Sequence, residues 1–185
     1  RFTNVTNGIA HRRWLCYSNP GLSSFIEGLI GYGYRHAPEE LAELKKFADD
    51  KNVLAELGEI KHQNKIAFSN LLMKKTGKCL DPNFVFDVQI KRLHEYKRQL
   101  LNALNIINLY CDLKENPNLD IQPQAFIFGA KASAGYIRAK QIIKLINSVA
   151  DVINNDRSIN GKLKVVFIED YRVSNAEWIF AAADV

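Results

Sequence analysis

The chain has 185 residues, 47% of them hydrophobic, which is enough to build the core of one ordinary domain. Its formal charge of +5 is moderate, and apart from Lys74-Lys75 and Lys91–Arg98 the cations are dispersed. A nucleic-acid-binding protein would show a basic stripe interleaved with aromatic residues, and the sequence has no such stripe. No apolar run approaches the ~20 residues that a membrane span needs. We therefore expect neither nucleic acid nor a membrane as a partner.

Three cysteines, Cys16, Cys79 and Cys111, show neither metal-ligand nor Cys-x-x-Cys spacing. They are typical of reduced thiols, so we expect a cytoplasmic protein. The histidines are not spaced as ligands either, and no metal site is predicted. Arg1 is not an initiator methionine, and the chain stops in the apolar run Ala181–Val185, so we expect a segment of a longer protein.

Residues 1–83 are predicted to be mainly helical and to lead into the following domain. Asn19 and Pro20 are typical of a helix cap and first helical position. A second helix is expected near Glu39–Asp49. A third should run from about Asn52 to Lys75, with an apolar face that we predict to consist of Leu54, Leu57, Ile60, Phe68, Leu71 and Leu72.

Residues 84–185 change to alternating strands and helices. Strands are expected at 84–90, 125–128 and 163–168, and helices over 134–153 and from the segment Lys91–Arg98 to about Asn116. The apolar stripe of the earlier helix is predicted as Leu93, Tyr96, Leu100, Leu104, Ile107 and Cys111. That of the later one is predicted as Ala139, Ile142, Ile143, Ile146, Val149 and Ile153. This order predicts an α/β fold, a truncated Rossmann-like parallel sheet with flanking helices, the whole chain forming one partial domain.

The three predicted strands are each followed by a segment rich in candidate functional residues. These segments are Lys91–Arg98, the glycine loop Gly129–Gly135, and Glu169–Ser174. Carboxyl ends of parallel strands meet at one edge of a sheet, and ligands bind in the crevice outside that edge. We therefore expect the three loops to form one site.

Four cations and one carboxylate lie in Lys91–Arg98, where a helix is expected to begin. A helix N-terminus favours anions, and lysine and arginine add charge-assisted hydrogen bonds, so Lys91, Arg92 and Lys97 are predicted to bind an anion. For Arg98 we favour an exposed helical pair with Glu95. Tyr96 is expected to point toward the packed side.

The glycine loop Gly129–Gly135 is open to two interpretations. It is not a Walker loop, because no Gly-Lys-Ser/Thr ends it. It is either a phosphate cradle or a tight strand-to-helix turn with Lys131 in solvent.

Five stretches of the sequence resemble the α-glucan phosphorylases, the glycogen, starch and maltodextrin phosphorylase family. They are Phe2–Leu15 with its Thr-Asn-Gly and Arg-Arg-Trp, Asn19–Leu22, Phe86–Asn102, Gly129–Tyr136, and Val166–Ser174. The resemblance implies an enzyme that transfers the terminal glucosyl unit of an α-1,4-glucan to inorganic phosphate and releases glucose 1-phosphate. It also implies a place in the C-terminal domain of a GT-B glycosyltransferase architecture, and a homodimer as the full-length enzyme.

The same resemblance assigns substrate residues. Arg92 and Lys97 would hold the substrate phosphate, and Tyr96 and Asn7 would hydrogen-bond the glucosyl hydroxyls. Cations at such a site would offset repulsion between phosphates and stabilise the developing charge of the transition state.

Pyridoxal phosphate is the implied cofactor, its 5′-phosphate taking part in proton transfer. Lys91 would contact that phosphate, Trp14 would pack by the ring, and Tyr171 and Arg172 would line the pocket. The family's Schiff-base lysine lies beyond Val185, so no lysine of this chain is given that role. Two departures from the family pattern are His11 before Arg-Arg-Trp and the absence of a proline in the glycine loop.

Two other classes remain open at the level of sequence. One is a nucleotide-sugar glycosyltransferase of similar architecture, such as a glycogen synthase, and the other is a non-catalytic phosphosugar-binding module. The preferred glucan and the control of the enzyme are not indicated by these residues.

Overall fold

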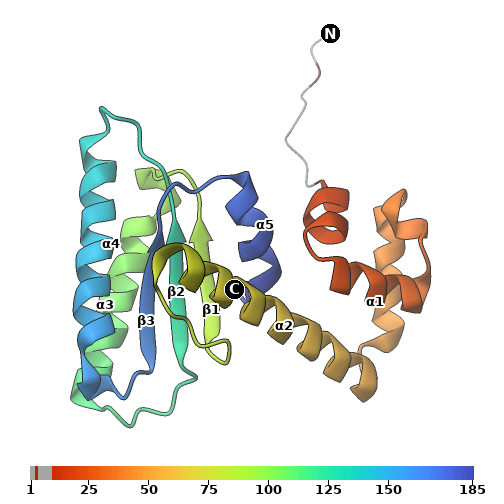
Figure 1. The fold of residues 1–185 in the computed structure, drawn as a ribbon, viewed down its shortest axis with the longest axis horizontal. Helices are drawn as coiled ribbons and strands as arrows, with labels where there is room; N and C mark the ends of the chain where they lie inside the picture. The colour runs from red at the N-terminus through yellow and green to blue at the C-terminus, as the bar shows by residue number, and fades with distance from the viewer. Residues whose placement is uncertain (1–2, 4–9) are drawn as a thin grey trace.

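A computed structural model describes residue 3 and residues 10–185. It has a three-stranded parallel sheet with helices on both faces, preceded by a helical region that lies to one side of the sheet (Figure 1). The predicted α/β fold is therefore confirmed. None of the helices described is both long and apolar enough to cross a membrane.

The helical region begins with a π-helical segment, Arg12–Tyr17, which is followed by α1, Pro20–Ile30. The predicted cap is confirmed, because the Asn19 side chain accepts a hydrogen bond from the backbone N–H of Leu22 at 3.3 Å. Two 3₁₀ segments follow, Gly33–Arg35 and Pro38–Phe47. The second replaces the expected helix at 39–49. No side chain in it is buried, so there is little packing to select α-helical geometry.

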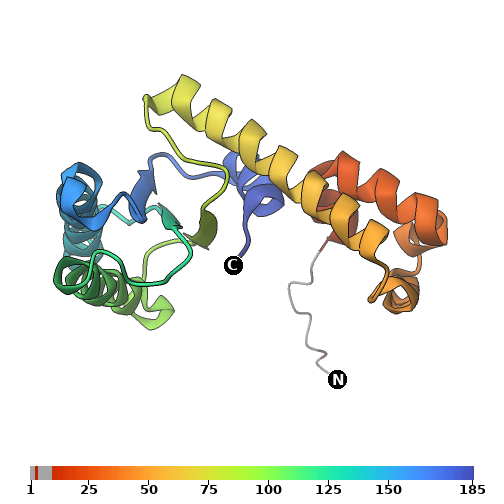
Figure 2. The ribbon, with the colours of Figure 1, turned by 90° about the horizontal axis from the view of Figure 1, so that it is seen from below.

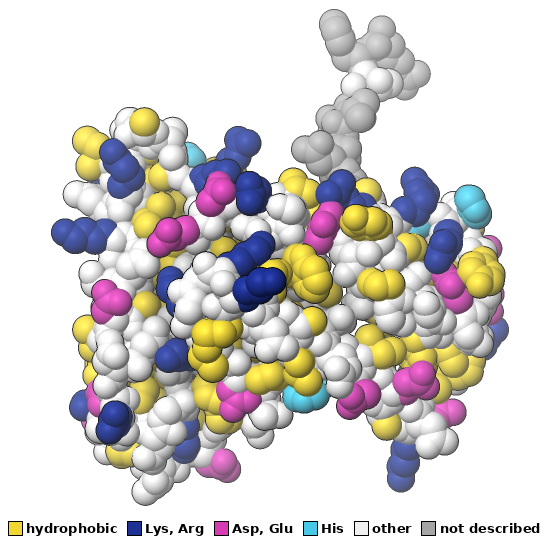
Figure 3. Space-filling view, viewed as in Figure 1, with side chains coloured by type: hydrophobic (Ala, Val, Ile, Leu, Met, Phe, Trp, Pro, Cys, Tyr) yellow, Lys and Arg dark blue, Asp and Glu magenta, His cyan; other side chains and the backbone are white. Residues whose placement is uncertain are grey.

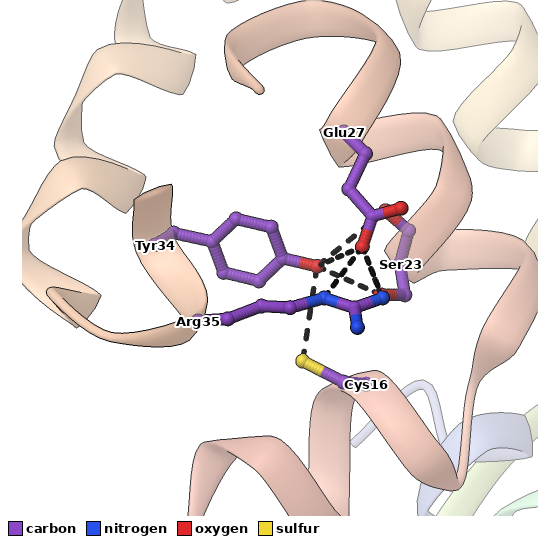
Figure 4. A network of polar contacts seen from close by, with 5 residues as sticks. All are labelled: Cys16, Ser23, Glu27, Tyr34 and Arg35. Carbon is purple, nitrogen blue, oxygen red and sulfur yellow. Dashed lines mark hydrogen bonds and ion pairs between the residues drawn. The ribbon is translucent and has the colours of Figure 1, made fainter. Parts of the chain in front are cut away.

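A buried tyrosine ties α1 to the first 3₁₀ segment (Figure 4). Tyr34 is fully buried, and its hydroxyl lies 2.8 Å from the Ser23 hydroxyl and 3.8 Å from the Cys16 sulfur. The Arg35 guanidinium donates to the Glu27 carboxylate at 2.7 Å beside it. Burial raises the pKa of the Tyr34 phenol, so this hydroxyl stays protonated as a donor.

The long helix α2, Lys51–Thr76, matches the predicted third helix. Asp50 caps it by accepting from the N–H groups of Asn52 and Val53, and Gly77 ends it with φ 70°. Only part of its predicted apolar face is correct. Phe68 and Leu72 are buried, whereas Leu54 and Leu57 are 48% and 40% exposed. The first half of α2 extends past the sheet and lies beside α1, which leaves those leucines outside the core (Figure 2).

The sheet consists of β1, Val85–Ile90, β2, Gln124–Gly129, and β3, Leu163–Ile168, in the order β1-β2-β3. Both pairs are parallel, as predicted, with Asp87 opposite Phe126 and Ile127 opposite Val166. Phe86 and Ile90 of β1 are buried on one face, in line with the expected alternation.

Helices cover both faces of the sheet (Figures 1 and 2). On one face lie α3, Gln99–Glu115, and α4, Ile137–Asn155; on the other lie the end of α2 and α5, Val173–Ala182. The predicted stripe of α4 is confirmed, with Ala139, Ile142, Ile146 and Ile153 buried. The helix α5 was not predicted.

The helical start expected in Lys91–Arg98 is wrong. Glu95–Lys97 form one 3₁₀ turn, Arg98 has a left-handed φ of 62°, and α3 begins at Gln99. The His94 ring accepts the N–H of Tyr96 at 3.4 Å, which favours a local turn over a continuous helix.

The break also rotates α3 relative to the predicted stripe. Ala103, Ile106 and Leu113 are buried, whereas Leu100 and Leu104 are 42% and 51% exposed. Leu93 was predicted as part of the apolar stripe of this helix. It does lie in the core, but it belongs to the loop that precedes α3.

The residues after α5 pair with the free edge of β1. Val185 donates its N–H to the Phe86 carbonyl at 3.1 Å, and its own carbonyl accepts the N–H of Val88 at 2.8 Å. This is the pattern of a parallel strand pair opposite Asp87. The chain thus crosses from β3, on one side of β1, to the other side, which makes the edge of β1 a topological switch point.

Candidate functional site

The three loops that follow the strands lie together at the carboxyl edge of the sheet, as predicted. The N–H of Leu93 donates to the Lys131 carbonyl at 3.1 Å, which joins the first loop to the second. The Lys131 ammonium lies 3.1 Å from the Asp170 carboxylate, which joins the second loop to the third. Figure 3 shows lysine and arginine side chains, with a few carboxylates, over this end of the strands.

One pocket at this edge, of about 480 Å³, is named here the tryptophan pocket. Its aromatic walls are Trp14 and Tyr171, and Phe180 of α5 packs edge-on against Trp14 with the ring centroids 4.9 Å apart. Three cations also line the pocket, one from the loop after each strand, namely Arg92, Lys131 and Arg172.

Gly129, the last residue of β2, allows Tyr171 to reach this pocket. A Cβ atom at Gly129 would lie 3.2 Å from the Tyr171 ring and 2.9 Å from the Ile90 side chain. Both distances are shorter than ordinary carbon contacts, so only glycine permits this close approach. By contrast, a Cβ at Gly135 would meet nothing within 4 Å. The glycine loop is therefore tight at its first glycine only.

A second pocket, of about 440 Å³, lies at the switch point and is named here the lysine pocket. The loop after β1 contributes Lys91, Tyr96 and Lys97 to its lining, and α5 with the residues after it contributes Phe180, Ala183 and Val185. Because Phe180 also lines the tryptophan pocket, the two pockets share that side chain.

The basic loop is held in place by amide side chains. Gln89 donates to the Lys97 carbonyl at 3.1 Å and accepts from Asn102 at 3.1 Å. Gln99, which is 1% exposed, donates to the Arg92 carbonyl at 3.4 Å. These contacts fix the backbone that carries Lys91, Arg92 and Lys97.

The carboxylates at this edge are engaged by other groups. Lys131 lowers the pKa of Asp170 and keeps it ionised, while Arg138 and the Tyr136 hydroxyl lower the pKa of Glu95. Glu95 therefore pairs with Arg138, at 2.7 Å, and not with Arg98 as predicted. Within residues 10–185, no carboxylate lies within 4 Å of a side-chain nitrogen of Lys91, Arg92 or Lys97, as expected for an anion site.

The predicted site residues fall into two groups. Trp14, Arg92, Tyr171 and Arg172 share the tryptophan pocket, and Lys91, Tyr96 and Lys97 share the lysine pocket. Asn7 lies outside the described residues. Burial raises the pKa of the Tyr171 phenol, so its hydroxyl stays neutral in the pocket.

Tyr96 does not point toward the packed side, because its side chain is 70% exposed and faces the lysine pocket. Sequence reasoning missed Phe180 and Gln89, and it left Lys131 open between a phosphate cradle and a solvent-exposed turn. No pattern within α5 marks Phe180, since its position depends on the crossover to β1. Among the residues described, no cluster of His, Cys, Asp and Glu is arranged to hold a metal ion.

Comparison with known proteins identifies the same family as the sequence resemblance described above. The family model described as carbohydrate phosphorylase matches residues 1–185. The chain belongs to the carbohydrate phosphorylase family.

Named relatives extend this result. The chain is 51% identical to a glycogen phosphorylase of Bacillus subtilis, 46% to one of Synechocystis, and 48% to the liver form of Homo sapiens. Each match covers 100% of this chain but only 22 to 23% of the relative. The chain thus spans less than a quarter of the length of these carbohydrate phosphorylases.

Proposed function

We propose that the chain forms part of an α-1,4-glucan phosphorylase and supplies one wall of its phosphate and cofactor site. The enzyme would transfer the terminal glucosyl unit of a glucan to inorganic phosphate and release glucose 1-phosphate. One observation carries the proposal. Three cations that pair with no carboxylate among residues 10–185 line two adjoining pockets at the switch point, and they are Lys91, Arg92 and Lys97.

The tryptophan pocket fits the ring and phosphate of pyridoxal phosphate. Trp14 and Tyr171 offer apolar faces to an aromatic ring, and Arg92, Lys131 and Arg172 offer cations to a phosphate, although Lys131 and Arg172 also pair with Asp170. The resemblance assigns Arg92 to the substrate phosphate and Lys91 to the cofactor phosphate, whereas in the structure Arg92 lines the tryptophan pocket and Lys91 lines the lysine pocket. Its volume of about 480 Å³ lies in the range of small-molecule sites. When bound, the cofactor would supply a phosphate group able to exchange a proton with the substrate phosphate.

The residues of this chain would act by binding and orienting charged groups. Lys91 and Arg92 are consecutive but line different pockets, so one stretch of backbone reaches both. Two phosphates held side by side repel each other, and these cations offset the repulsion while the transition-state charge develops. Lys97 would bind the substrate phosphate, and the Tyr96 hydroxyl would hydrogen-bond a sugar hydroxyl.

No carboxylate nucleophile is required by this scheme, unlike in ordinary retaining glycosidases. The GT-B architecture, a homodimeric full-length enzyme and a cytoplasmic location belong to the same proposal. They follow from the family resemblance and from the cysteine pattern described above.

The full-length protein that contains this chain provides the test. Incubated with maltodextrin, it should release glucose 1-phosphate only when inorganic phosphate is present, and it should show pyridoxal absorbance. Glucosyl transfer from a nucleotide sugar without any phosphorolysis would support the glycosyltransferase alternative. Phosphosugar binding without turnover would support a non-catalytic module.

A further inference from the structure

We propose that Lys61 and Lys65 of α2 are positioning residues for the lysine pocket. They hold the end of α5 and the residues after it against β1, and so fix the wall that faces Lys91 and Lys97. The inference rests on the proposed function in one respect, namely that the lysine pocket binds inorganic phosphate.

Lys65 is a buried cation with a complete set of partners. It is 7% exposed, and its ammonium donates to the Asp184 carboxylate at 2.7 Å and to the Phe84 carbonyl at 2.6 Å. It also lies 4.6 Å from the centre of the Phe86 ring. A lysine is rarely buried unless its charge is paired, so this arrangement fixes one geometry of Asp184.

Asp184 in turn hydrogen-bonds the residues after α5 to β1. The carboxylate oxygen that accepts from Lys65 also accepts the N–H of Phe86 at 2.8 Å, and the N–H of Asp184 donates to the Phe86 carbonyl at 3.0 Å. Val185 continues this pairing along β1. The edge of β1 at the switch point is therefore closed by residues that Lys65 holds in place.

Lys61 lies one helical turn before Lys65 on the same face of α2. Its ammonium donates to the Ala183 carbonyl at 2.6 Å and to the Ala181 carbonyl at 3.2 Å. These are carbonyls at the C-terminal end of α5, where a helix leaves its acceptors unsatisfied and favours a cation. Burial lowers the pKa of Lys61, in keeping with its partly enclosed position.

The segment held by the two lysines includes residues that line the pockets. Ala183 and Val185 line the lysine pocket together with Lys91 and Lys97, and Phe180, one turn earlier on α5, lines both pockets. If the end of α5 moved away from β1, the lysine pocket would widen and Phe180 would shift against Trp14. A small displacement of a binding wall weakens binding without removing any ligand contact from the chain.

The test compares Lys61→Met with Lys74→Met in the full-length protein. Both replace a lysine of α2 with an apolar side chain of similar length, but Lys74 is exposed near the far end of the helix. We expect the dissociation constant of inorganic phosphate, measured by titration calorimetry, to rise at least fivefold in Lys61→Met. It should stay within twofold of wild type in Lys74→Met, and the KM for maltodextrin should stay within twofold in both.

Hydrogen exchange provides a readout that a general loss of stability would not reproduce. At a temperature well below unfolding, the amides of residues 86–88 and 184–185 should exchange faster in Lys61→Met, while those of β2 and β3 stay protected. Lys65→Met should show the same local pattern with a larger effect on phosphate. If Lys65→Met fails to fold, Lys61→Met alone decides.

The inference is overturned if a folded Lys61→Met protein has an unchanged dissociation constant for phosphate and unchanged hydrogen exchange at β1. In that case, phosphorolysis by the wild type still leaves the proposed function intact. A wild type without phosphorolysis, whose phosphate binding nevertheless weakens in Lys61→Met only, overturns the proposed function and supports the positioning role. A wild type that binds no inorganic phosphate overturns both.

Discussion

Neighbouring cations in Lys91–Arg98 lie in different places because the backbone turns between them. Lys91 and Arg92 follow directly from β1, where successive side chains point to opposite sides, and they reach different pockets. Lys97 ends a 3₁₀ turn and faces the lysine pocket, whereas Arg98 adopts a left-handed φ of 62° and lines neither pocket. Position in the turn, more than charge, thus separates the cations that line a pocket from Arg98, which lines neither.

Replacing Lys97 with alanine should weaken the use of inorganic phosphate far more than the binding of glucan. The substitution removes a charge-assisted contact and should cost about 2 to 4 kcal/mol of transition-state stabilisation. Steady-state kinetics of the full-length protein, with phosphate and maltodextrin varied separately, measures the difference.

Arg98→Ala is the matched control, since Arg98 lies one residue away and is exposed. It should be nearly silent, because alanine and arginine meet the same steric cost at positive φ. If Lys97→Ala left both the rate and the phosphate KM within about threefold of wild type, Lys97 would be an ordinary surface lysine.

Gly129→Ala should destabilise the protein and disturb the tryptophan pocket. The new methyl group would press on Tyr171 and Ile90, and overpacking of this kind typically costs about 1 to 3 kcal/mol. Chemical denaturation gives the loss of stability, and titration with pyridoxal phosphate gives the loss of affinity. Gly135→Ala, where the methyl group has open space, should change both by much less.

At the level of elements, regular patterns were predicted well. The period-two alternation of β1 and the threefold and fourfold spacing in α4 gave correct elements and correct buried faces. Local capping residues also gave the start of α1. Signals of this kind depend only on residues close in sequence.

The errors arose where distant contacts decide the local structure. The loop before α3 is held by Gln89, Tyr136 and Arg138, which come from other elements, so its sequence alone resembled the first turn of a helix. The predicted site residues came together as expected at the sheet edge, but their division between two pockets depends on α5. That helix was missed, and so was Phe180.

The contact between α3 and the turn after α4 should make stability depend on pH. Tyr110 of α3 donates to the Asp156 carboxylate at 2.6 Å, and this hydrogen bond is the main cause that lowers the pKa of Asp156. A depressed carboxyl pKa stabilises the folded state above the unfolded pKa of about 4, and the gain is lost as the pH falls.

Tyr110→Phe should therefore lower the melting temperature at pH 7, and the difference from wild type should shrink as the pH falls below about 4. Thermal unfolding followed by circular dichroism over pH 3 to 7 measures this. Tyr17→Phe serves as the control, because Tyr17 is 72% exposed, and it should show no such trend. A difference that stayed constant with pH would mean that packing, not the carboxylate, accounts for the effect of Tyr110.

At the scale of the molecule, the outer edge of β3 is covered by side chains. Asn154 donates to the Val165 carbonyl at 2.7 Å and accepts the Val165 N–H at 3.0 Å, and Lys78 donates to the Phe167 carbonyl at 3.0 Å. Covered edges reduce pairing between chains. With a buried hydrophobic cluster on each face of the sheet as well, residues 1–185 have what a cooperative fold requires.

We predict that residues 1–185 expressed alone fold but release no glucose 1-phosphate from maltodextrin. The chain spans 22 to 23% of its relatives, and both pockets are partly open to solvent. Inorganic phosphate should still bind weakly near Lys91 and Lys97, with an affinity that falls steeply with salt, because exposed charges are screened. Calorimetric titration at several potassium chloride concentrations measures this, and Lys97→Ala in the same fragment should abolish the binding.

The fragment incubated with pyridoxal phosphate and reduced with borohydride should show no lysine labelled stoichiometrically. One lysine fully labelled, together with turnover of maltodextrin, would mean that these residues hold a complete catalytic centre.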